Sequence, residues 1–464
     1  MDEQSALNEL ERKVLLGKKL GVFDDREGRQ LLKCYQHGIL DSFVVGRING
    51  RVTAALRRLA LSGSPFLPHK LHRGNFIFGL DPQGNLIRID RQYLNAHVLI
   101  LGGTGSGKSN QQKFRATLLA PFVSGIWLFD IRKAEYRALR PVFKRMGIDL
   151  KVIRSRMFQL NPLQVPLDVE PIEYAAVAAG FLVRALDLPP RAATLLSSTI
   201  ITLYREHGIL NGGRKYPTLF HLFEAVRTNR NAHPQARQAV LDNLGAVLQA
   251  LGPEILGYHC GWEVHQLARH HLVCELAGWP DSGKNVVLDY LLTAEFVSRV
   301  ARGISNCQMN LWISFDESRR LFSQRQETAS HGGSGLTDLV GLVRGTGIGL
   351  EISVLTTHDL SAYVPNLTST KIMGRCGSIT EYTAAGRFMG LNAEQIEWCA
   401  HHLVPGLFVG QVGEGHWRYP FLFTVPLVDR IDMETLGAEE STDDPSEAVA
   451  MPTDKAHDID GRFL

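Results

Sequence analysis

The sequence lacks any apolar run long enough to cross a membrane. Its longest apolar stretch, Tyr174 to Val183, has 10 residues, whereas a membrane-spanning helix needs roughly 18. The first ten residues carry no basic-then-apolar leader signal. The six cysteines are scattered singly without a Cys-x-x-Cys pair, which argues against a zinc site and a disulfide framework. We therefore expect a cytoplasmic protein with reduced thiols and no integral membrane segment.

The sequence also has little net charge, because its 50 Lys and Arg are nearly balanced by 47 Asp and Glu. The balance hides an asymmetry. Residues 433–464 hold nine acidic and two basic residues, a charge of −7, which leaves +10 (48 basic minus 38 acidic) for residues 1–432. The acidic tail is poor in aromatics, and its composition predicts disorder. A basic body is compatible with a nucleic-acid partner but serves solubility equally well.

The order of apolar patterns predicts an α/β fold. Strand-like runs alternate with helical patterns, which is typical of a mostly parallel sheet wrapped by helices. We expect a small helical domain at 1–62, the sheet domain at 63–432 with an all-helical insertion at about 162–262, and a hairpin over Phe76–Arg91 around a Gln-Gly turn. The predicted strands are His97–Leu101, Ile126–Ile131, Leu150–Ile153, His271–Leu276, Leu311–Phe315, Ile352–Thr356 and Leu407–Val409.

The run LILGGTGSGKS, residues 99–109, matches the phosphate-binding pattern G-x-x-x-x-G-K-S/T between a predicted strand and a predicted helix. Backbone N–H groups of such a loop cradle phosphates, while Lys108 would place its charge on the β and γ groups and Ser109 would reach magnesium. A mere glycine-rich turn is the alternative. The sequence therefore predicts a P-loop ATPase using ATP and Mg²⁺. The residues expected at the nucleotide are Gly102, Gly103, Thr104, Gly105, Ser106, Gly107, Lys108, Ser109 and Asn110.

Hydrolysis also needs a carboxylate for the metal and a base for the attacking water. The run LWISFDE ends a predicted strand with Asp316, expected at magnesium, and Glu317, expected to orient water. An acidic helix cap after a strand is the competing interpretation. A second run with P-loop spacing, GWPDSGKN at residues 278–285, has Asn285 in place of Ser or Thr and a stiffening Pro280, so we interpret it as a connecting loop.

The ordered set of motifs resembles the HerA/FtsK superfamily of hexameric DNA-pumping ATPases, and HerA-like members in particular, over about residues 73–426. The resemblance implies a RecA-like core and a homo-oligomeric ring, a hexamer, acting on double-stranded DNA with a nuclease or another partner protein. Unlike many HerA proteins, which begin with a small β-barrel, this chain has a predicted helical N-terminus. The stretches that carry the resemblance are GLDPQGNLIRID, WLFDIRKAEY, LNPLQ, HLVCELAG, LWISFDESRRLF, LVRGTGIGLEISVLTTHDL and NLTSTKIMGRCGS.

The resemblance also implies roles for four residues. Asp130 would lie near the metal and water, and Arg344 would reach a neighbouring subunit's nucleotide, with Arg375 as the second candidate. His358 stands where the family usually has a Gln that senses the γ-phosphate, so its sensor role stays open. The alternatives without the resemblance are that Asp130 caps a helix, that Arg344 is a solvated loop charge and that His358 is an ordinary histidine at a strand end.

The implied function is an ATP-driven DNA translocase or helicase-type motor. The alternatives are an ATP-dependent regulatory or assembly ATPase of a multiprotein complex, and a secretion or conjugation coupling ATPase.

Overall fold

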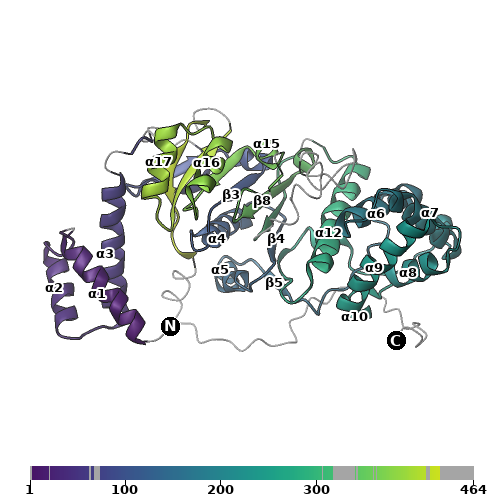
Figure 1. Ribbon diagram of the computed structural model, residues 1–464, viewed down its shortest axis with the longest axis horizontal. Helices are drawn as coiled ribbons and strands as arrows, with labels where there is room; N and C mark the ends of the chain where they lie inside the picture. Colours follow the sequence, from purple (N-terminus) through teal and green to yellow (C-terminus); the bar gives the residue numbers. More distant parts are fainter. Residues whose placement is uncertain are drawn as a thin grey trace.

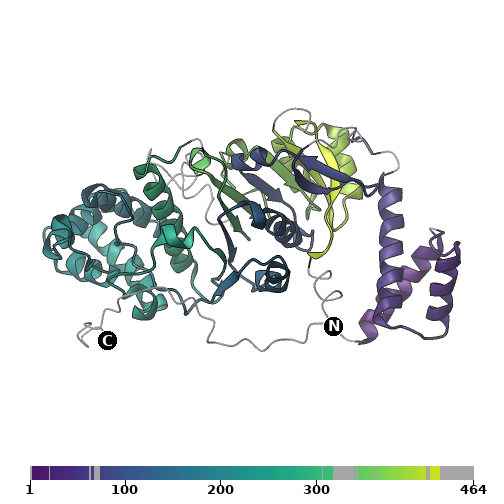
Figure 2. The same cartoon turned by 180° about the vertical axis from the view of Figure 1, so that it is seen from behind.

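A central α/β body lies between three N-terminal helices and a separate group of helices at its other end (Figure 1), and Figure 2 shows the same arrangement from behind. Glu317 and the acidic tail predicted at 433–464 lie outside the residues that the structure describes. This computed structural model describes residues 3–19, 21–61, 64–66, 74–305, 307–316, 340, 343–358, 360–361, 363–413 and 418–428.

An 11-stranded sheet forms the centre of the body, in the order β2-β1-β11-β10-β9-β3-β8-β7-β4-β6-β5. The strands from β9 to β5 pair in parallel, and those from β10 to β2 pair antiparallel. The α/β class with a mostly parallel sheet is thus confirmed. The strands are β1 Phe76–Leu80, β2 Leu86–Ile89, β3 Val98–Leu101, β4 Gly125–Asp130, β5 Leu150–Ile153, β6 His271–Glu275, β7 Leu311–Phe315, β8 Ile348–Val354, β9 Thr370–Met373, β10 Leu407–Val412 and β11 Phe421–Thr424.

The inner parallel strands are buried on both faces. Every residue of β3, β4, β7 and β8 is buried, as expected where helices cover both sides of a parallel sheet. The expected hairpin is confirmed, since β1 and β2 pair antiparallel. Its turn is closed by the Asp81 carboxylate, which accepts the backbone N–H groups of Gln83 and Asn85 at 2.9 and 2.7 Å.

Helices flank this sheet and fill the insertion. The whole stretch between β5 and β6, residues 154–270, is described and contains no strand. The buried Asn161 of the LNPLQ run connects three segments of the insertion, because its side-chain amide donates to the carbonyls of Pro217 and His259. The main helices of the body are α4 Lys108–Leu119, α5 Arg140–Arg145, α12 Asp281–Ala301, α16 Ile379–Phe388 and α17 Ala393–His402; those of the insertion are α6 Pro171–Ala185, α7 Arg191–Glu206, α8 Leu219–Thr228, α9 Pro234–Leu251, α10 Pro253–Leu256 and α11 Val264–Leu267.

The N-terminal helices α1 (Glu3–Lys19), α2 (Arg26–Gln36) and α3 (Ser42–Leu61) pack around an apolar cluster of their own. Leu10 and Val14 belong to this cluster, whereas Leu15 is 55% exposed. Asp25 caps α2 by accepting the N–H of Gly28 at 2.7 Å. Within the described part of the chain, no helix combines the length and apolarity required to span a membrane.

Candidate nucleotide-binding site

The glycine-rich loop connects β3 to α4 at the carboxyl edge of the parallel strands. Gly102, Gly105 and Gly107 have φ angles of 155°, 72° and 100°, a region that side chains with a Cβ disfavour. A Cβ on Gly107 would also lie 3.2 Å from the ring of Phe408. The sequence thus turns sharply from strand to helix here. Thr104 and Gly105 are exposed at the tip of the loop, Gly103 and Ser109 are partly exposed, and Ser106 and Lys108 are buried.

Neighbouring segments hold the loop in place. The N–H of Gly103 donates to the carbonyl of Arg375 at 2.8 Å, and the N–H of Gly406 donates to the carbonyl of Ser106 at 3.0 Å. The loop is therefore shaped by the ends of β9 and by the turn before β10, and its form is fixed by the fold around it.

The loop has the donors that an anion needs. The Lys108 ammonium lies inside it, 2.6 Å from the carbonyl oxygen of Gly102 and 2.9 Å from that of Gly103. The hydroxyl of Ser106 is buried and has no hydrogen-bond partner. Because a helix N-terminus adds N–H groups and a partial positive charge, the residues present fit a phosphate group.

Two carboxylates follow neighbouring strands near this loop. Asp130 ends β4 and Asp316 directly follows β7, and the N–H of Asp316 donates to the carbonyl of Phe129 at 3.3 Å. β8 lies between β3 and β7 in the sheet, so the acidic strand is the second neighbour of the P-loop strand. Oxygen ligands of this kind suit Mg²⁺.

Asp130 is fully buried, and this burial raises the pKa of its carboxyl to about 7. The carboxylates of Asp316 and Glu275 contribute to this rise, whereas hydrogen bonds from the backbone of Tyr136 and Glu135 oppose it. Oδ2 accepts the Tyr136 N–H at 3.0 Å, while Oδ1 has no hydrogen-bond partner. A cation beside Oδ1 would hold the group ionised.

A buried hydrogen-bond network, which the sequence motifs do not reveal, links these elements. The Tyr136 hydroxyl donates to Gln112 Oε1 at 2.8 Å, and Gln112 Nε2 donates to Ser314 Oγ at 2.9 Å. Ser314 Oγ donates to Glu351 Oε2, and Arg115 Nε donates to Glu351 Oε1 at 2.7 Å. The network joins α4 to β7 and β8. No pattern of spacing predicts it, because its members come from separate elements.

The candidate sensor follows β8 at the same edge. His358 is exposed, four residues beyond the last strand residue. The preceding Thr357 is fixed, since its N–H and hydroxyl both donate to Glu381 Oε2, at 2.7 and 2.8 Å. The structure therefore presents His358 from an anchored turn on the P-loop side of the sheet.

The two candidate arginines occupy opposite edges of the sheet. Arg375 is exposed two residues after β9, and its carbonyl accepts a hydrogen bond from the P-loop of its own chain. Arg344 begins the 3-10 helix η6 (Arg344–Thr346) just before β8. β8 is seven residues long, roughly 20 Å, and its last four residues pair in parallel with β3. Arg344 therefore lies far from its own P-loop.

Asn110 faces another segment. Its side-chain amide donates to the carbonyl of Pro426 at 2.8 Å, and its Oδ1 accepts the N–H of Val428 at 3.0 Å. Both ends of the amide are thus engaged by residues 426–428, and these contacts support a structural role.

No protein-family model and no curated protein sequence matches this chain. Solved structures do share its fold. VirB4 of Thermoanaerobacter pseudethanolicus is 16% identical with a TM-score of 0.59, over 77% of this chain and 98% of that one. The bacterial conjugative coupling protein TrwBΔN70 is 12% identical with a TM-score of 0.51, over 80% of this chain and 90% of that one. TrwB with the non-hydrolysable ATP analogue ADPNP is 11% identical with the same TM-score, over 80% and 91%. The chain thus has the RecA-like P-loop NTPase fold.

Proposed function

We propose that this protein is an ATP-driven, Mg²⁺-dependent DNA translocase of the HerA-like kind. The observation that carries the proposal is the P-loop, whose buried Lys108 lies at the same sheet edge as the carboxylates of Asp130 and Asp316. The fold of TrwB, which was solved with an ATP analogue, supports nucleotide binding by this loop. The motif order from FDIRKAEY to LTTHD supports the motor class.

The chain's own residues divide the work as follows. Lys108 and the amides of the loop bind and orient the phosphates, Ser109 and Asp316 hold the cation, and Glu317 positions the attacking water. Magnesium-bound ATP supplies the phosphoryl group and neutralises part of its charge. Asp130 stands next to Asp316 and adds to the negative potential that attracts the cation.

We further propose a ring, a hexamer, in which each nucleotide lies between two subunits. The position of Arg344 supports this assembly. Its backbone lies at the edge of the sheet opposite to its own P-loop, which favours a role at a neighbouring subunit's nucleotide. Double-stranded DNA in the channel, and a nuclease or other partner protein, follow from the motif resemblance.

A second candidate function is an ATPase that serves conjugation or secretion. The likeness to VirB4 and to the conjugative coupling protein TrwB favours it. A regulatory or assembly ATPase that moves no DNA is the third.

A DNA-stimulated ATPase assay separates these functions. Duplex DNA in low salt should raise the ATP turnover of the wild-type protein severalfold, because a translocase completes its ATPase cycle while it is bound to DNA. Lys108→Ala should show no turnover with or without DNA. Wild-type turnover that ignores duplex DNA would contradict the translocase and favour the regulatory function.

A further inference from the structure

The most basic part of the chain lies outside the nucleotide site, in residues 131–156, here called the basic segment. It holds nine Lys and Arg and two acidic residues, Glu135 and Asp149, a net charge of +7. Residues 1–432 together carry +10, so all the rest of that body carries only +3. The basic segment is therefore dense in positive charge, to which the nucleotide chemistry assigns no task.

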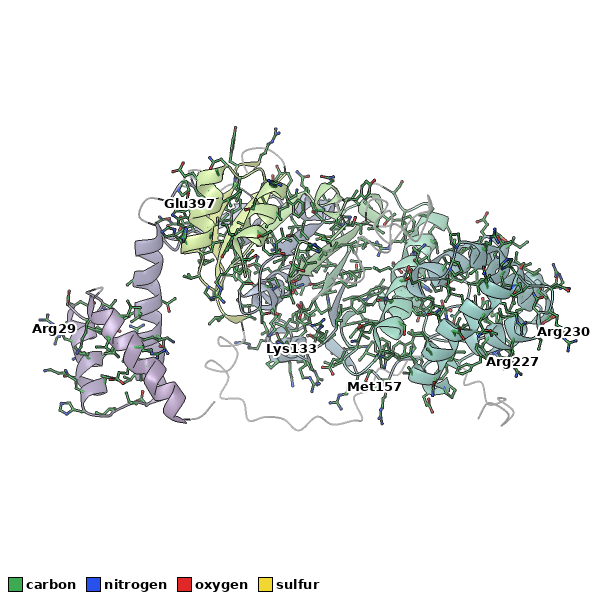
Figure 3. The ribbon with its side chains drawn as sticks, viewed as in Figure 1. Arg29, Lys133, Met157, Arg227, Arg230 and Glu397 are labelled. Atoms are coloured by element: carbon green, nitrogen blue, oxygen red, sulfur yellow. The ribbon has the colours of Figure 1, made fainter. Side chains whose placement is uncertain are left out.

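The basic segment covers one margin of the sheet. It runs from the end of β4 through α5 to β5, which among the described strands lies at the edge of the sheet and pairs with β6. Figure 1 shows α5 and β5 together at the lower margin, and Figure 3 places Lys133 and Met157 along that margin. The exposed basic residues are Arg132, Lys133, Arg137, Lys144, Arg145, Arg154 and Arg156, while Arg140 and Lys151 are partly exposed.

Strand direction brings part of this charge to the P-loop side. Because β4 and β5 both run parallel to β6, the residues that follow them meet at one edge, which gathers Arg132, Lys133, Arg154 and Arg156. Lys284, from the first turn of α12, lies near Arg132, and its ammonium is 3.8 Å from the carboxylate of Asp281. Burial and the nearby charge of Arg132 lower the pKa of its ammonium. Like charges thus stand together, and a phosphate between them would relieve their repulsion.

The loop after β4 presents its charges from a fixed backbone. Asp130 Oδ2 accepts the Tyr136 N–H, and the guanidinium of Arg137 makes two 2.8 Å hydrogen bonds to Glu275 on β6. Arg132 and Lys133 lie between these anchors. Within the loop, Lys133 is 3.5 Å from Glu135, and both side chains are substantially exposed, so water screens this pair.

We propose that the basic segment is a docking surface for the phosphate backbone of nucleic acid. The inference rests on the proposed translocase function and adds the surface through which the translocase would contact DNA. Duplex DNA carries one charge per about 1.7 Å, and exposed Lys and Arg bind it by releasing counterions, without reading sequence. Binding here would connect DNA to β4, the strand that also positions Asp130.

Protection of the sheet edge is the competing explanation, since charged residues on an edge strand block pairing with other chains. Of the nine basic residues, however, only Lys151 lies on β5 itself. The exposed ones lie in the flanking loops and on α5 and its neighbouring 3-10 helix. Edge protection therefore accounts for Lys151 but not for the exposed charges of the flanking loops and of α5.

Duplex binding measured over a salt series tests the surface. Lys133→Ala with Arg156→Ala should weaken DNA binding and reduce the slope of log affinity against log salt by about 2 per chain, one for each lost phosphate contact. The matched control, Arg227→Ala with Arg230→Ala, removes the same charge from the far end of the insertion (Figure 3) and should bind like wild type. Lys133→Arg with Arg156→Lys should retain the wild-type slope.

Each contrary outcome has a distinct meaning. Wild-type protein that binds no duplex DNA even in low salt would remove the proposed function itself. Wild-type binding that the Lys133 and Arg156 double variant fully retains would overturn only the docking surface. If that variant self-associates in sedimentation while keeping its DNA affinity, the charges protect the sheet edge and the inference is wrong. A thermal midpoint close to wild type confirms that the variant is folded.

Discussion

At the residue scale, the ammonium of Lys108 is buried against two carbonyls of its own loop. Lys108→Ala removes this charge and should abolish ATP turnover and weaken nucleotide binding. Glu317→Gln should bind ATP like wild type yet stall hydrolysis, since only the base for water is lost. Turnover and fluorescent-nucleotide binding distinguish the two variants. Turnover retained in Glu317→Gln would mean that the catalytic strand is misassigned.

The buried pair Arg115 and Glu351 predicts a different kind of result. Both side chains are at most 1% exposed, so losing one partner leaves the other charge uncompensated. Glu351→Leu should lower the free energy of unfolding by about 3–5 kcal/mol, and adding Arg115→Met should restore most of that loss. Urea denaturation of the two single variants and the double variant measures the coupling. A double variant as unstable as the sum of the singles would contradict this account.

At the scale of elements, α8 begins with a histidine-dependent cap. The N–H of Thr218 donates to Nδ1 of His221 in a capping box, and the rings of His207 and His259 lie 5.1 and 5.6 Å from that of His221. The pKa of His221 is lowered to about 4, chiefly by burial and also by the nearby charges of His207, His259 and Lys215. Protonation would remove the acceptor from the cap.

This cap predicts acid sensitivity of the insertion. The unfolded chain takes up the His221 proton near pH 6.5 and the folded chain only near pH 4, so stability should fall as the pH drops through this window. His221→Gln keeps an acceptor at the cap but does not titrate, and it should reduce the loss of thermal midpoint on acidification by on the order of 2 °C or more. The exposed His401→Gln is the control. Equal acid sensitivity in His221→Gln and wild type would disprove the role.

The same scale shows what the sequence predicts and what it misses. Apolar runs such as Leu311–Phe315 coincide with β7 because a doubly covered parallel strand needs continuous apolar residues. β8 begins at Ile348, not at the predicted Ile352, because Glu351 appears polar in sequence yet is paired inside the fold. β9 and β11 were not predicted, since β9 has only four residues, two of them polar.

The candidate site likewise has features that the sequence predicts and features that it does not. The loop at 102–109 is local in sequence, so spacing alone predicts it. The contacts of Gln112 with Ser314 and of Asn110 with Pro426 join residues that lie far apart in the chain, and tertiary packing alone creates them.

At the scale of the whole molecule, the position of Arg344 predicts active sites shared between subunits. Arg344→Ala should assemble and bind ATP almost normally but hydrolyse it on the order of a thousandfold more slowly, because the developing phosphoryl charge loses a cation. Mixing it with Lys108→Ala subunits lets some interfaces combine an intact P-loop with an intact arginine. Steady-state ATPase of the mixture should then exceed that of either variant alone.

Arg375→Ala in the same mixing experiment is the control, since its backbone touches its own P-loop. If mixed rings are verified by mass and only the Arg375→Ala mixture regains activity, Arg375 is the shared arginine and Arg344 is not.

The hydrogen bonds of Asn110 with Pro426 and Val428 have a mechanical consequence. Val428 is fastened to the first turn of α4, two residues from Lys108. A pull on the chain beyond Val428, from a bound protein or a fused tag, would therefore be transmitted as tension to the phosphate-binding loop. A pulling force applied to a tag ahead of α1 would act instead on the N-terminal helices, which pack around an apolar cluster of their own. Force applied beyond Val428 would therefore reach the nucleotide-binding loop more directly than force applied ahead of α1.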